Sequence, residues 1–90
     1  MDDVMVTCVV REQHAYDPHY GITHVGGKGW TWTRAAVVES IQNRTNTFYT
    51  KADGRRADVQ VVSGLYGPYL RTHRDGVATN NLLELDRCPV

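Results

Sequence analysis

The sequence predicts one α+β domain over residues 1–90, in which an antiparallel sheet of order β-β-α-β-β-β carries one amphipathic helix on one face. Three observations predict this class. Several short stretches alternate between apolar and polar residues, as strands do. One stretch repeats its apolar residues at helical spacing, and glycine-containing turns separate the later stretches. Ninety residues correspond to one domain with a single hydrophobic layer.

Two strands are expected before the helix. Residues 4–11 form the first strand, and because apolar residues fall on both of its faces, we expect it at the centre of the sheet. Residues 13–19 predict a turn marked by Asp17-Pro18, and residues 20–25 predict a short second strand. The glycine run at residues 26–29 ends that strand and predicts a flexible turn.

The helix is expected after the segment Trp30–Thr33. Thr33 is its predicted N-cap, because a threonine hydroxyl can accept a hydrogen bond from a free amide of the first turn. Ala35, Val38 and Ile41, with Val37 beside them, predict one apolar face. We expect the helix to fray at Asn43-Arg44, where asparagine and threonine replace good helix formers.

Strands and turns alternate after the helix. In chain order they are residues 47–51, Asp53-Gly54, residues 57–63, residues 65–68, residues 69–72 and Asp75-Gly76. Asp53-Gly54 predicts a hairpin because glycine takes the positive φ angle that tight hairpin turns need. The apolar tail at residues 80–85 is expected to dock as a short strand or one helical turn.

The charge pattern and the cysteines limit the binding partners and the cellular location that the sequence predicts. Ten basic residues balance ten acidic ones, so no overall field attracts nucleic acid or an anionic membrane. Asp2 and Asp3 stand where a secretory signal carries basic residues, and no apolar run is long enough to cross a membrane. Cys8 and Cys88 are too few for a disulfide framework. We expect buried thiols in a cytoplasmic protein, close together if the strands at the two ends are neighbours.

A series of short motifs covers nearly the whole chain in order. The first is Ile22-Thr-His-Val-Gly-Gly27, and a tryptophan (Trp30 or Trp32) follows it. The others are Thr33-x-x-Ala36-Val37, Phe48-Tyr49, Val59-x-Val61-Val62, Tyr69-Leu70-x-Thr72, Asp75-Gly76 and Asn80-Asn81-Leu82-Leu83-x-Leu85-x-x-Cys88. Together they resemble a small bacterial family of domains of unknown function, DUF3892. The resemblance implies a compact stand-alone domain and brings no activity, substrate or catalytic residue.

No enzymatic activity is expected. His24 lies beside the glycine run and could act as an acid–base group near neutral pH. No nucleophile that it could activate is apparent, so we expect it to bond the backbone of the glycine turn or to pack on Trp30. The glycine run fits neither a P-loop nor a dinucleotide-binding loop. Ser40 and Ser63 lie in no G-x-S-x-G motif.

No metal and no cofactor is expected either. The cysteines and histidines show neither the C-x-x-C spacing nor the H-x-x-x-H spacing of metal sites. His14 and His19 lie in the predicted polar turn, and we expect both to be exposed to solvent.

The leading functional hypothesis is a non-enzymatic domain that binds an unknown protein partner and also forms a homodimer. It rests on more large aromatic side chains than a small core hides: Tyr20, Trp30, Trp32, Phe48, Tyr49, Tyr66 and Tyr69. The candidate contact residues are His24, Trp30, Trp32, Tyr49 and Tyr69. A small-molecule site around His24, Trp30 and Tyr69 is a less favoured reading of the same residues.

The alternative hypothesis is a weak nucleic-acid-binding module. Residues 28–56 hold six basic residues against two acidic ones. The candidate phosphate contacts are Arg34, Arg44, Lys51, Arg55 and Arg56. Trp30, Trp32 and Tyr49 are the aromatic residues that could stack on bases. Because the net charge is zero, a solvated helix face and a charged hairpin tip explain the same residues.

Overall fold

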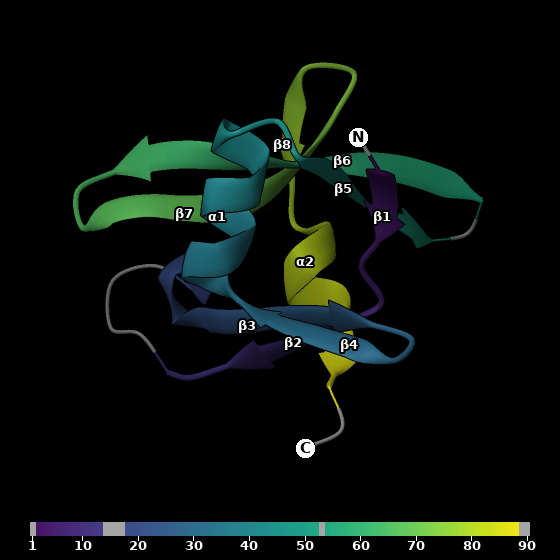
Figure 1. The fold of residues 1–90 in the computed structure, drawn as a ribbon, viewed down its shortest axis with the longest axis horizontal. Coiled ribbons are helices and arrows are strands. Elements are labelled where there is room, and N and C mark those ends of the chain that lie inside the picture. Colours follow the sequence, from purple (N-terminus) through teal and green to yellow (C-terminus); the bar gives the residue numbers. More distant parts are fainter. Residues whose placement is uncertain (1, 14–17, 53, 89–90) are drawn as a thin grey trace.

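The computed structural model describes residues 2–13, 18–52 and 54–88. These residues form two β-sheets, and the helices pack between them (Figure 1). The first sheet has the spatial order β1 (Asp2–Met5), β5 (Asn46–Ala52), β6 (Arg55–Gly64), β7 (Gly67–Arg74) and β8 (Val77–Thr79). The second has the order β4 (Trp30–Thr33), β3 (Ile22–Gly27), β2 (Cys8–Arg11) and β9 (Asp86–Arg87). The helical segments are the 3-10 turn η1 (Pro18–Gly21), α1 (Arg34–Gln42) and α2 (Asn81–Glu84).

The predicted fold class is wrong. The described residues are mostly β, with 58% in strands and 21% in helical segments, and they form two mixed sheets instead of one antiparallel sheet. β1 pairs parallel with β5, and β2 pairs parallel with β9. Both parallel pairs join segments that lie far apart in the chain. No turn marks such a pairing, so the local pattern carries no sign of it.

The predicted first strand breaks in two at Val6 and Thr7. The Val6 amide donates to the Tyr49 carbonyl oxygen of β5 at 2.7 Å, whereas the Thr7 amide donates to the Gly26 carbonyl oxygen of β3 at 2.9 Å. The chain therefore leaves the first sheet and enters the second within one peptide unit. This crossing explains the apolar residues on both faces of the segment, since its two halves contribute to two different sheets.

The start of α1 follows the prediction. The Ala36 amide donates to the Thr33 hydroxyl oxygen at 3.1 Å, so Thr33 is confirmed as the N-cap. The predicted apolar face is confirmed at Val37 and Val38, which are buried, and at Ile41, which packs against the core, whereas Ala35 is exposed. Trp30–Thr33, expected to lead into the helix, forms strand β4 instead.

The end of α1 is a Schellman turn, in which the last carbonyl groups accept bonds from amides beyond the helix. The Arg44 amide donates to the Ile41 carbonyl oxygen at 3.1 Å. The Thr45 amide donates to the Ser40 carbonyl oxygen at 3.0 Å. Arg44 takes a φ of 59°, in the left-handed region where such turns usually place glycine. The predicted end at Asn43-Arg44 is confirmed.

Hairpins order the second half of the chain. Asp75 and Gly76 have φ angles of 52° and 79°, as a tight two-residue turn requires, and β8 follows as a strand that the sequence did not predict. Gly54 has a φ of 76° between β5 and β6, whereas Asp53 lies outside the described residues, as does Asp17 of the first predicted turn. The apolar tail docks as α2 and is followed by β9.

The hydrophobic core lies between the two sheets. Its fully buried side chains come from both sheets and both helices, and the largest are Phe48, Ile22, Leu70 and Leu82. α1 contacts strands of both sheets, and so does α2. The helices therefore pack between the two sheets and contribute to the core, whereas the prediction had one helix on an outer face of a single sheet.

Cys8 and Cys88 form a disulfide, which corrects the prediction of two free thiols. β2 and β9 are neighbours, and the Cα atoms of the two cysteines are 4.8 Å apart. The bond lies against Gly26, where an added Cβ would stand 3.1 Å and 3.0 Å from the two sulfur atoms and 2.7 Å from the Trp30 carbonyl oxygen. The first glycine of the glycine run therefore makes room for the disulfide.

Candidate binding groove

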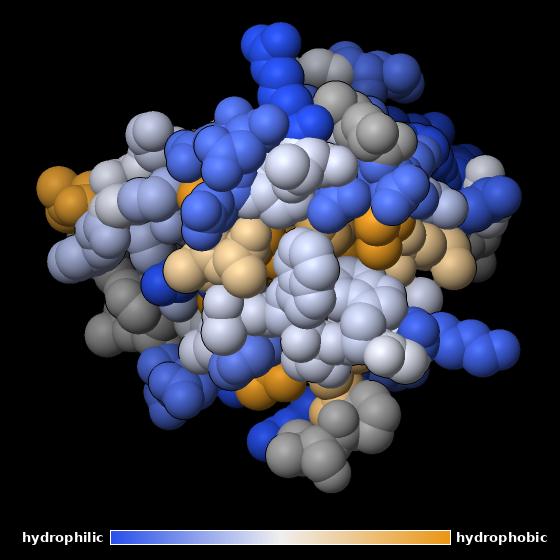
Figure 2. Space-filling view, in the orientation of Figure 1, coloured by the Kyte–Doolittle hydropathy of each residue, from blue (hydrophilic) through white to orange (hydrophobic). Residues whose placement is uncertain are grey.

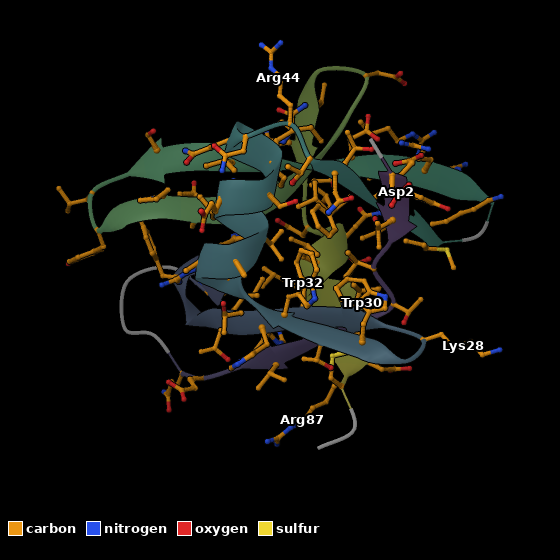
Figure 3. All side chains as sticks on the ribbon, viewed as in Figure 1. Asp2, Lys28, Trp30, Trp32, Arg44 and Arg87 are labelled. Carbon is orange, nitrogen blue, oxygen red and sulfur yellow. A yellow bond between two sulfur atoms is a disulfide. The ribbon has the colours of Figure 1, made fainter. Side chains whose placement is uncertain are left out.

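A groove opens where the edge strands of the two sheets meet. β1 is an edge of the first sheet, and β4 is an edge of the second. The groove has a volume of about 230 Å³. It is lined by Asp2 and Val4 of β1, Trp30 and Trp32 of β4, and Asn46 and Phe48 of β5. Figure 3 shows both tryptophans extending from β4 into the space between the sheets, toward the side on which Asp2 lies.

The β3–β4 hairpin positions the tryptophans. Gly29 takes a φ of 82° in the turn, and β4 then pairs antiparallel with β3. Trp30 and Trp32 are two residues apart on one strand, so their side chains point to the same face. Trp30 packs over Gly27, where an added Cβ would lie 2.5 Å from the indole nitrogen. The second glycine of the glycine run thus makes room for this ring.

Three aromatic rings form the floor of the groove. The ring centroids of Trp30 and Trp32 are 6.1 Å apart, and those of Trp32 and Phe48 are 6.0 Å apart. Trp30 and Phe48 close the triangle at 6.1 Å. The planes are tilted or perpendicular, which is the favourable geometry for aromatic pairs. Phe48 is fully buried, whereas Trp32 is 40% exposed, so the cluster presents a firm aromatic surface to solvent.

The rim of the groove is polar. Asp2 and Asn46 lie opposite each other in the parallel β1–β5 register. The Asn46 amide nitrogen donates to the Ser40 hydroxyl at 3.0 Å, which ties this rim to the end of α1. The Asp2 carboxylate is exposed, and no side chain of residues 2–13, 18–52 or 54–88 forms an ion pair or hydrogen bond with it. One anionic group is therefore available beside the aromatic floor.

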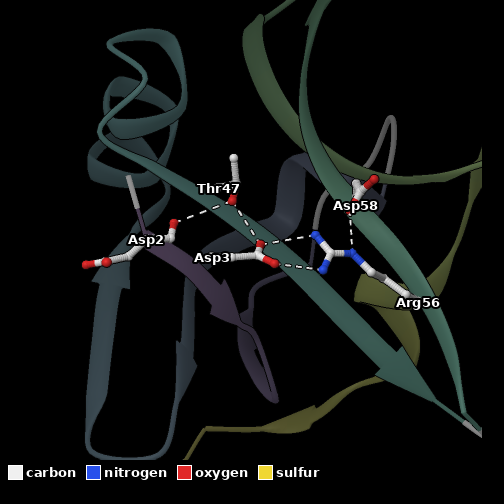
Figure 4. A network of polar contacts seen from close by, with 5 residues as sticks. All are labelled: Asp2, Asp3, Thr47, Arg56 and Asp58. Atoms are coloured by element: carbon white, nitrogen blue, oxygen red, sulfur yellow. Dashed lines mark hydrogen bonds and ion pairs between the residues drawn. The ribbon is translucent and has the colours of Figure 1, made fainter.

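The opposite face of the β1–β5 pair carries a polar network (Figure 4). The Arg56 guanidinium donates to both oxygens of Asp3, at 2.7 and 3.1 Å, and to Asp58 at 2.9 Å. Its carbon lies 4.2 Å from the centre of the Tyr49 ring. Thr47 donates to Asp3 at 2.8 Å. Figure 4 shows the Asp2 carboxylate pointing away from this network.

The network shifts two pKa values. The hydrogen bonds from Arg56 lower the pKa of the Asp3 carboxyl, and the hydrogen bond from Thr47 lowers it further. The hydrogen bonds to Asp3 and then to Asp58 raise the pKa of Arg56. Both partners are therefore more firmly charged than in an unfolded chain.

The structure separates the five candidate contact residues. Trp30 and Trp32 lie together in the groove, whereas Tyr49 lies on the other face of β5 beneath Arg56. Tyr69 belongs to a second aromatic cluster, in which its ring centroid lies 4.8 Å from that of Tyr20. His24 is half-buried, and its Nδ1 lies 2.9 Å from the Thr23 hydroxyl. A single small-molecule site around His24, Trp30 and Tyr69 is not formed.

The second aromatic cluster supports a hairpin. The Tyr20 hydroxyl accepts from the Tyr66 amide and donates to the Gly67 carbonyl oxygen, both at 3.1 Å, and so holds the β6–β7 turn. Gly64 allows this approach because an added Cβ would collide with the Tyr20 hydroxyl. His19 stacks near Tyr69 and is 4% exposed, so the expectation of a solvent-exposed His19 is wrong. His14 lies outside the described residues.

Three of the five candidate phosphate contacts, Lys51, Arg55 and Arg56, lie at the β5–β6 hairpin, and the other two, Arg34 and Arg44, lie at the two ends of α1. Arg34 donates to the Tyr20 carbonyl oxygen at 2.8 Å, and Arg56 is held in the Asp3 network. Lys51 and Arg55 lie beside the β5–β6 turn, and Arg44 follows α1. Figure 3 shows Arg44, Lys28 and Arg87 pointing to different sides of the molecule. These cations form no common surface beside the tryptophans.

Sequence reasoning found the tryptophans but missed Asp2, Val4 and Asn46. These three residues reach the groove only through the parallel pairing of β1 with β5, across 44 positions of the chain. In the sequence, Asp2 stands out only as an acidic residue. An exposed acid two residues before a half-buried valine gives no local sign that tryptophans from another sheet lie beside it.

Two classes of feature are absent from the described parts of the chain. No group of three or more histidine, cysteine, aspartate or glutamate residues there is arranged to hold a metal ion. Within the same ranges, each helix is too short or too polar to traverse a lipid bilayer.

The comparisons with known proteins give one match. A family model described as "Protein of unknown function (DUF3892)" matches residues 5–86. No curated protein and no solved structure matches the chain at a significant level.

Proposed function

The chain belongs to the DUF3892 family of proteins of unknown function, and we propose that it is a non-enzymatic interaction domain that binds a partner protein. The groove between β1 and β4 is the proposed contact site. One observation carries the proposal: an aromatic floor with an exposed tryptophan lies between two sheet edges. Unpaired strand edges bind extended segments through main-chain hydrogen bonds, and neighbouring pockets select the side chains.

The chemistry of the groove supports binding better than catalysis. Asp2 is the one ionisable residue among the six that line it. A general base or a nucleophile needs a second group within hydrogen-bond reach to activate or orient it. Asn46, the other polar residue of the lining, is held by Ser40. The proposal therefore assigns no reaction to this site.

Selection of peptides from a displayed library tests the proposal. Immobilised protein should enrich extended peptides, and those peptides should bind Trp32→Ala at least tenfold more weakly than the wild type. Val77→Ala is the matched control, because Val77 is an exposed apolar residue on the edge strand β8, outside the groove. Circular dichroism checks that both variants fold. Failure to enrich any peptide, or equal binding to Trp32→Ala, would contradict the proposal.

Self-association is the second part of the proposal. Leu65 and Tyr66 form the tip of the β6–β7 hairpin and are 75% and 59% exposed. Figure 2 shows apolar surface at the left, over the end of this hairpin, and an apolar band across the middle of the same face. Exposed apolar side chains at a projecting tip suit contact with a second copy. Native mass spectrometry of untagged protein should show a dimer, and a monomer at every concentration would contradict it.

Nucleic-acid binding is the weaker alternative. Two of its five candidate arginines and lysines, Arg34 and Arg56, already hold partners within the chain. Phosphate contacts make binding fall steeply with added salt. Binding of a single-stranded oligonucleotide that weakens in this way would favour the alternative. Absence of such binding would favour the proposed protein-interaction domain.

A cytoplasmic location stays a prediction. The Cys8–Cys88 bond weighs against it, because cytosolic reductants keep most thiols reduced. Alkylation of the protein in lysate prepared without reductant measures this directly. Modification of both cysteines supports the cytoplasm, and modification only after reduction opposes it.

A further inference from the structure

We propose that the groove binds the guanidinium group of an arginine side chain in an extended segment of the partner protein. This inference rests on the proposed function and deepens it, because it names the chemistry of the bound side chain.

The β1–β5 pair already binds one arginine on its other face. There Asp3 accepts two hydrogen bonds from Arg56, and the Tyr49 ring lies 4.2 Å beneath the guanidinium carbon. The carboxylate on β1 and the aromatic ring beside it contact the guanidinium together, and Asp58 on β6 accepts a third hydrogen bond from it. Such a pair suits arginine, whose planar group donates two parallel hydrogen bonds and stacks on an aromatic face.

The groove contains a second pair of a β1 carboxylate and an aromatic side chain, Asp2 and Trp32, and no cation of the described residues pairs with this carboxylate. Asp2 is the residue before Asp3, so its side chain points to the opposite face of β1, where the tryptophans lie. No cation of the described residues pairs with Asp2, whereas Arg56 pairs with Asp3. Lys28 and Arg44, the charged groups at the ends of the neighbouring elements, point away from the groove (Figure 3).

The charge and the rings select the ligand class. A carboxylate repels phosphate and acidic side chains. The indole of tryptophan is the ring with the strongest attraction for a cation over its face. Trp32 is 40% exposed, so its ring is open to a ligand, while its contacts with Trp30 and Phe48 hold it in place. An arginine can therefore stack on a fixed ring and donate to Asp2.

The volume favours a single side chain. Pockets for whole metabolites enclose about 300–1,000 Å³. The groove encloses about 230 Å³ and is open to solvent along β1 and β4. A side chain can enter it while the backbone that carries it runs along a strand edge.

The test uses the intrinsic fluorescence of the protein. The chain contains two tryptophans, and both line the groove, so their emission reports its occupancy. The probes are two capped five-residue peptides of valine and threonine, one with a central arginine and one with citrulline. Citrulline has nearly the same shape and no charge. We expect the arginine peptide to bind at least tenfold more tightly than the citrulline peptide.

Two variants make the test specific. Asp2→Asn should weaken binding of the arginine peptide at least tenfold and leave binding of the citrulline peptide unchanged. Asp75→Asn is the matched control, because Asp75 is an exposed aspartate in the distant β7–β8 turn and asparagine also tolerates its left-handed φ. It should bind both peptides as the wild type does.

Four outcomes would overturn the inference. Equal binding of the arginine and citrulline peptides would show that charge plays no part. Unchanged binding by Asp2→Asn would show that the carboxylate is not the contact. Enrichment of library peptides that bind through Trp32 but lack arginine would overturn the inference while leaving the proposed interaction domain intact. A library that enriches no peptide would instead overturn both.

Discussion

Arg56 links three strands through its side chain alone. Its guanidinium reaches Asp3 on β1 and Asp58 on its own strand, and it covers Tyr49 on β5. Asp3 and Arg56 are 53 positions apart, so no spacing in the sequence connects them. A surface ion pair is ordinarily weak. This one has two parallel hydrogen bonds and fastens β1, which is an edge strand of the first sheet.

We expect Asp3→Asn to reduce thermal stability near neutral pH and to lose this effect in acid. The pKa of Asp3 is lowered in the folded protein from its ordinary value of 3.8. Its contribution is therefore present above the unfolded value and is lost as the pH falls through the lower folded value. The measurement is the difference in Tm between variant and wild type at about pH 7 and about pH 2.

Two further variants identify the cause. Arg56→Gln removes the partner of Asp3 and should follow the same pH dependence. Arg55→Gln removes a neighbouring exposed arginine that does not contact Asp3, and it should not. A constant Tm difference for Asp3→Asn from neutral to acid pH would contradict the assignment.

Among the helices and strands, the features that the sequence predicted are those set by residues close together in the chain, such as a helix cap and a tight turn. Thr33 predicted the start of α1 because its hydroxyl caps the helix from three residues away. Asp75-Gly76 predicted a turn because both residues take positive φ angles. The short strands β4, β8 and β9 were missed, since two to four residues give too little alternation to detect. Parallel pairing was also missed, because its partners are distant in the chain.

We expect Arg44→Gly to stabilise the protein. A side chain with a Cβ costs about 1–2 kcal/mol in the left-handed region. Glycine removes this cost, but its greater conformational freedom in the unfolded chain offsets about 0.5–1 kcal/mol of the gain. Because Arg44 has a φ of 59°, the net gain should be about 0.5–1 kcal/mol in the free energy of unfolding.

Urea denaturation measures this gain, with Arg44→Ala as the control. Alanine removes the charge and keeps the Cβ, so it should give no comparable increase. An equal gain for both variants would assign the effect to charge and not to the backbone.

At the scale of the whole molecule, the ends of the described chain lie in different sheets. β1 adds a parallel edge strand to the first sheet, and β9 adds one to the second. The disulfide then fastens the segment after β9 to β2 across 80 positions. The groove depends on this arrangement, because β1 and β4 become neighbours only when both sheets pack around the helices.

We expect the double variant Cys8→Ala, Cys88→Ala to lose about 2–5 kcal/mol of the free energy of unfolding. A crosslink between distant residues limits the unfolded chain, and it is worth more when the closed loop is long. Urea denaturation with and without a reductant gives the measurement. Reduction should destabilise the wild type by a similar amount and leave the variant unchanged, and a variant as stable as the oxidised wild type would contradict the expectation.

The pairing of β2 with β9 also sets the moment at which the domain can form during synthesis. Residues 8 and 9 leave the ribosome well before residues 86 and 87, which pair with them in the folded protein. The partner of Cys8 follows at residue 88. The nascent second sheet therefore keeps one edge of β2 uncovered until residues 86 and 87 have been translated. Exposed strand edges invite pairing with other chains, so a chaperone that covers this edge would protect the nascent chain during that interval.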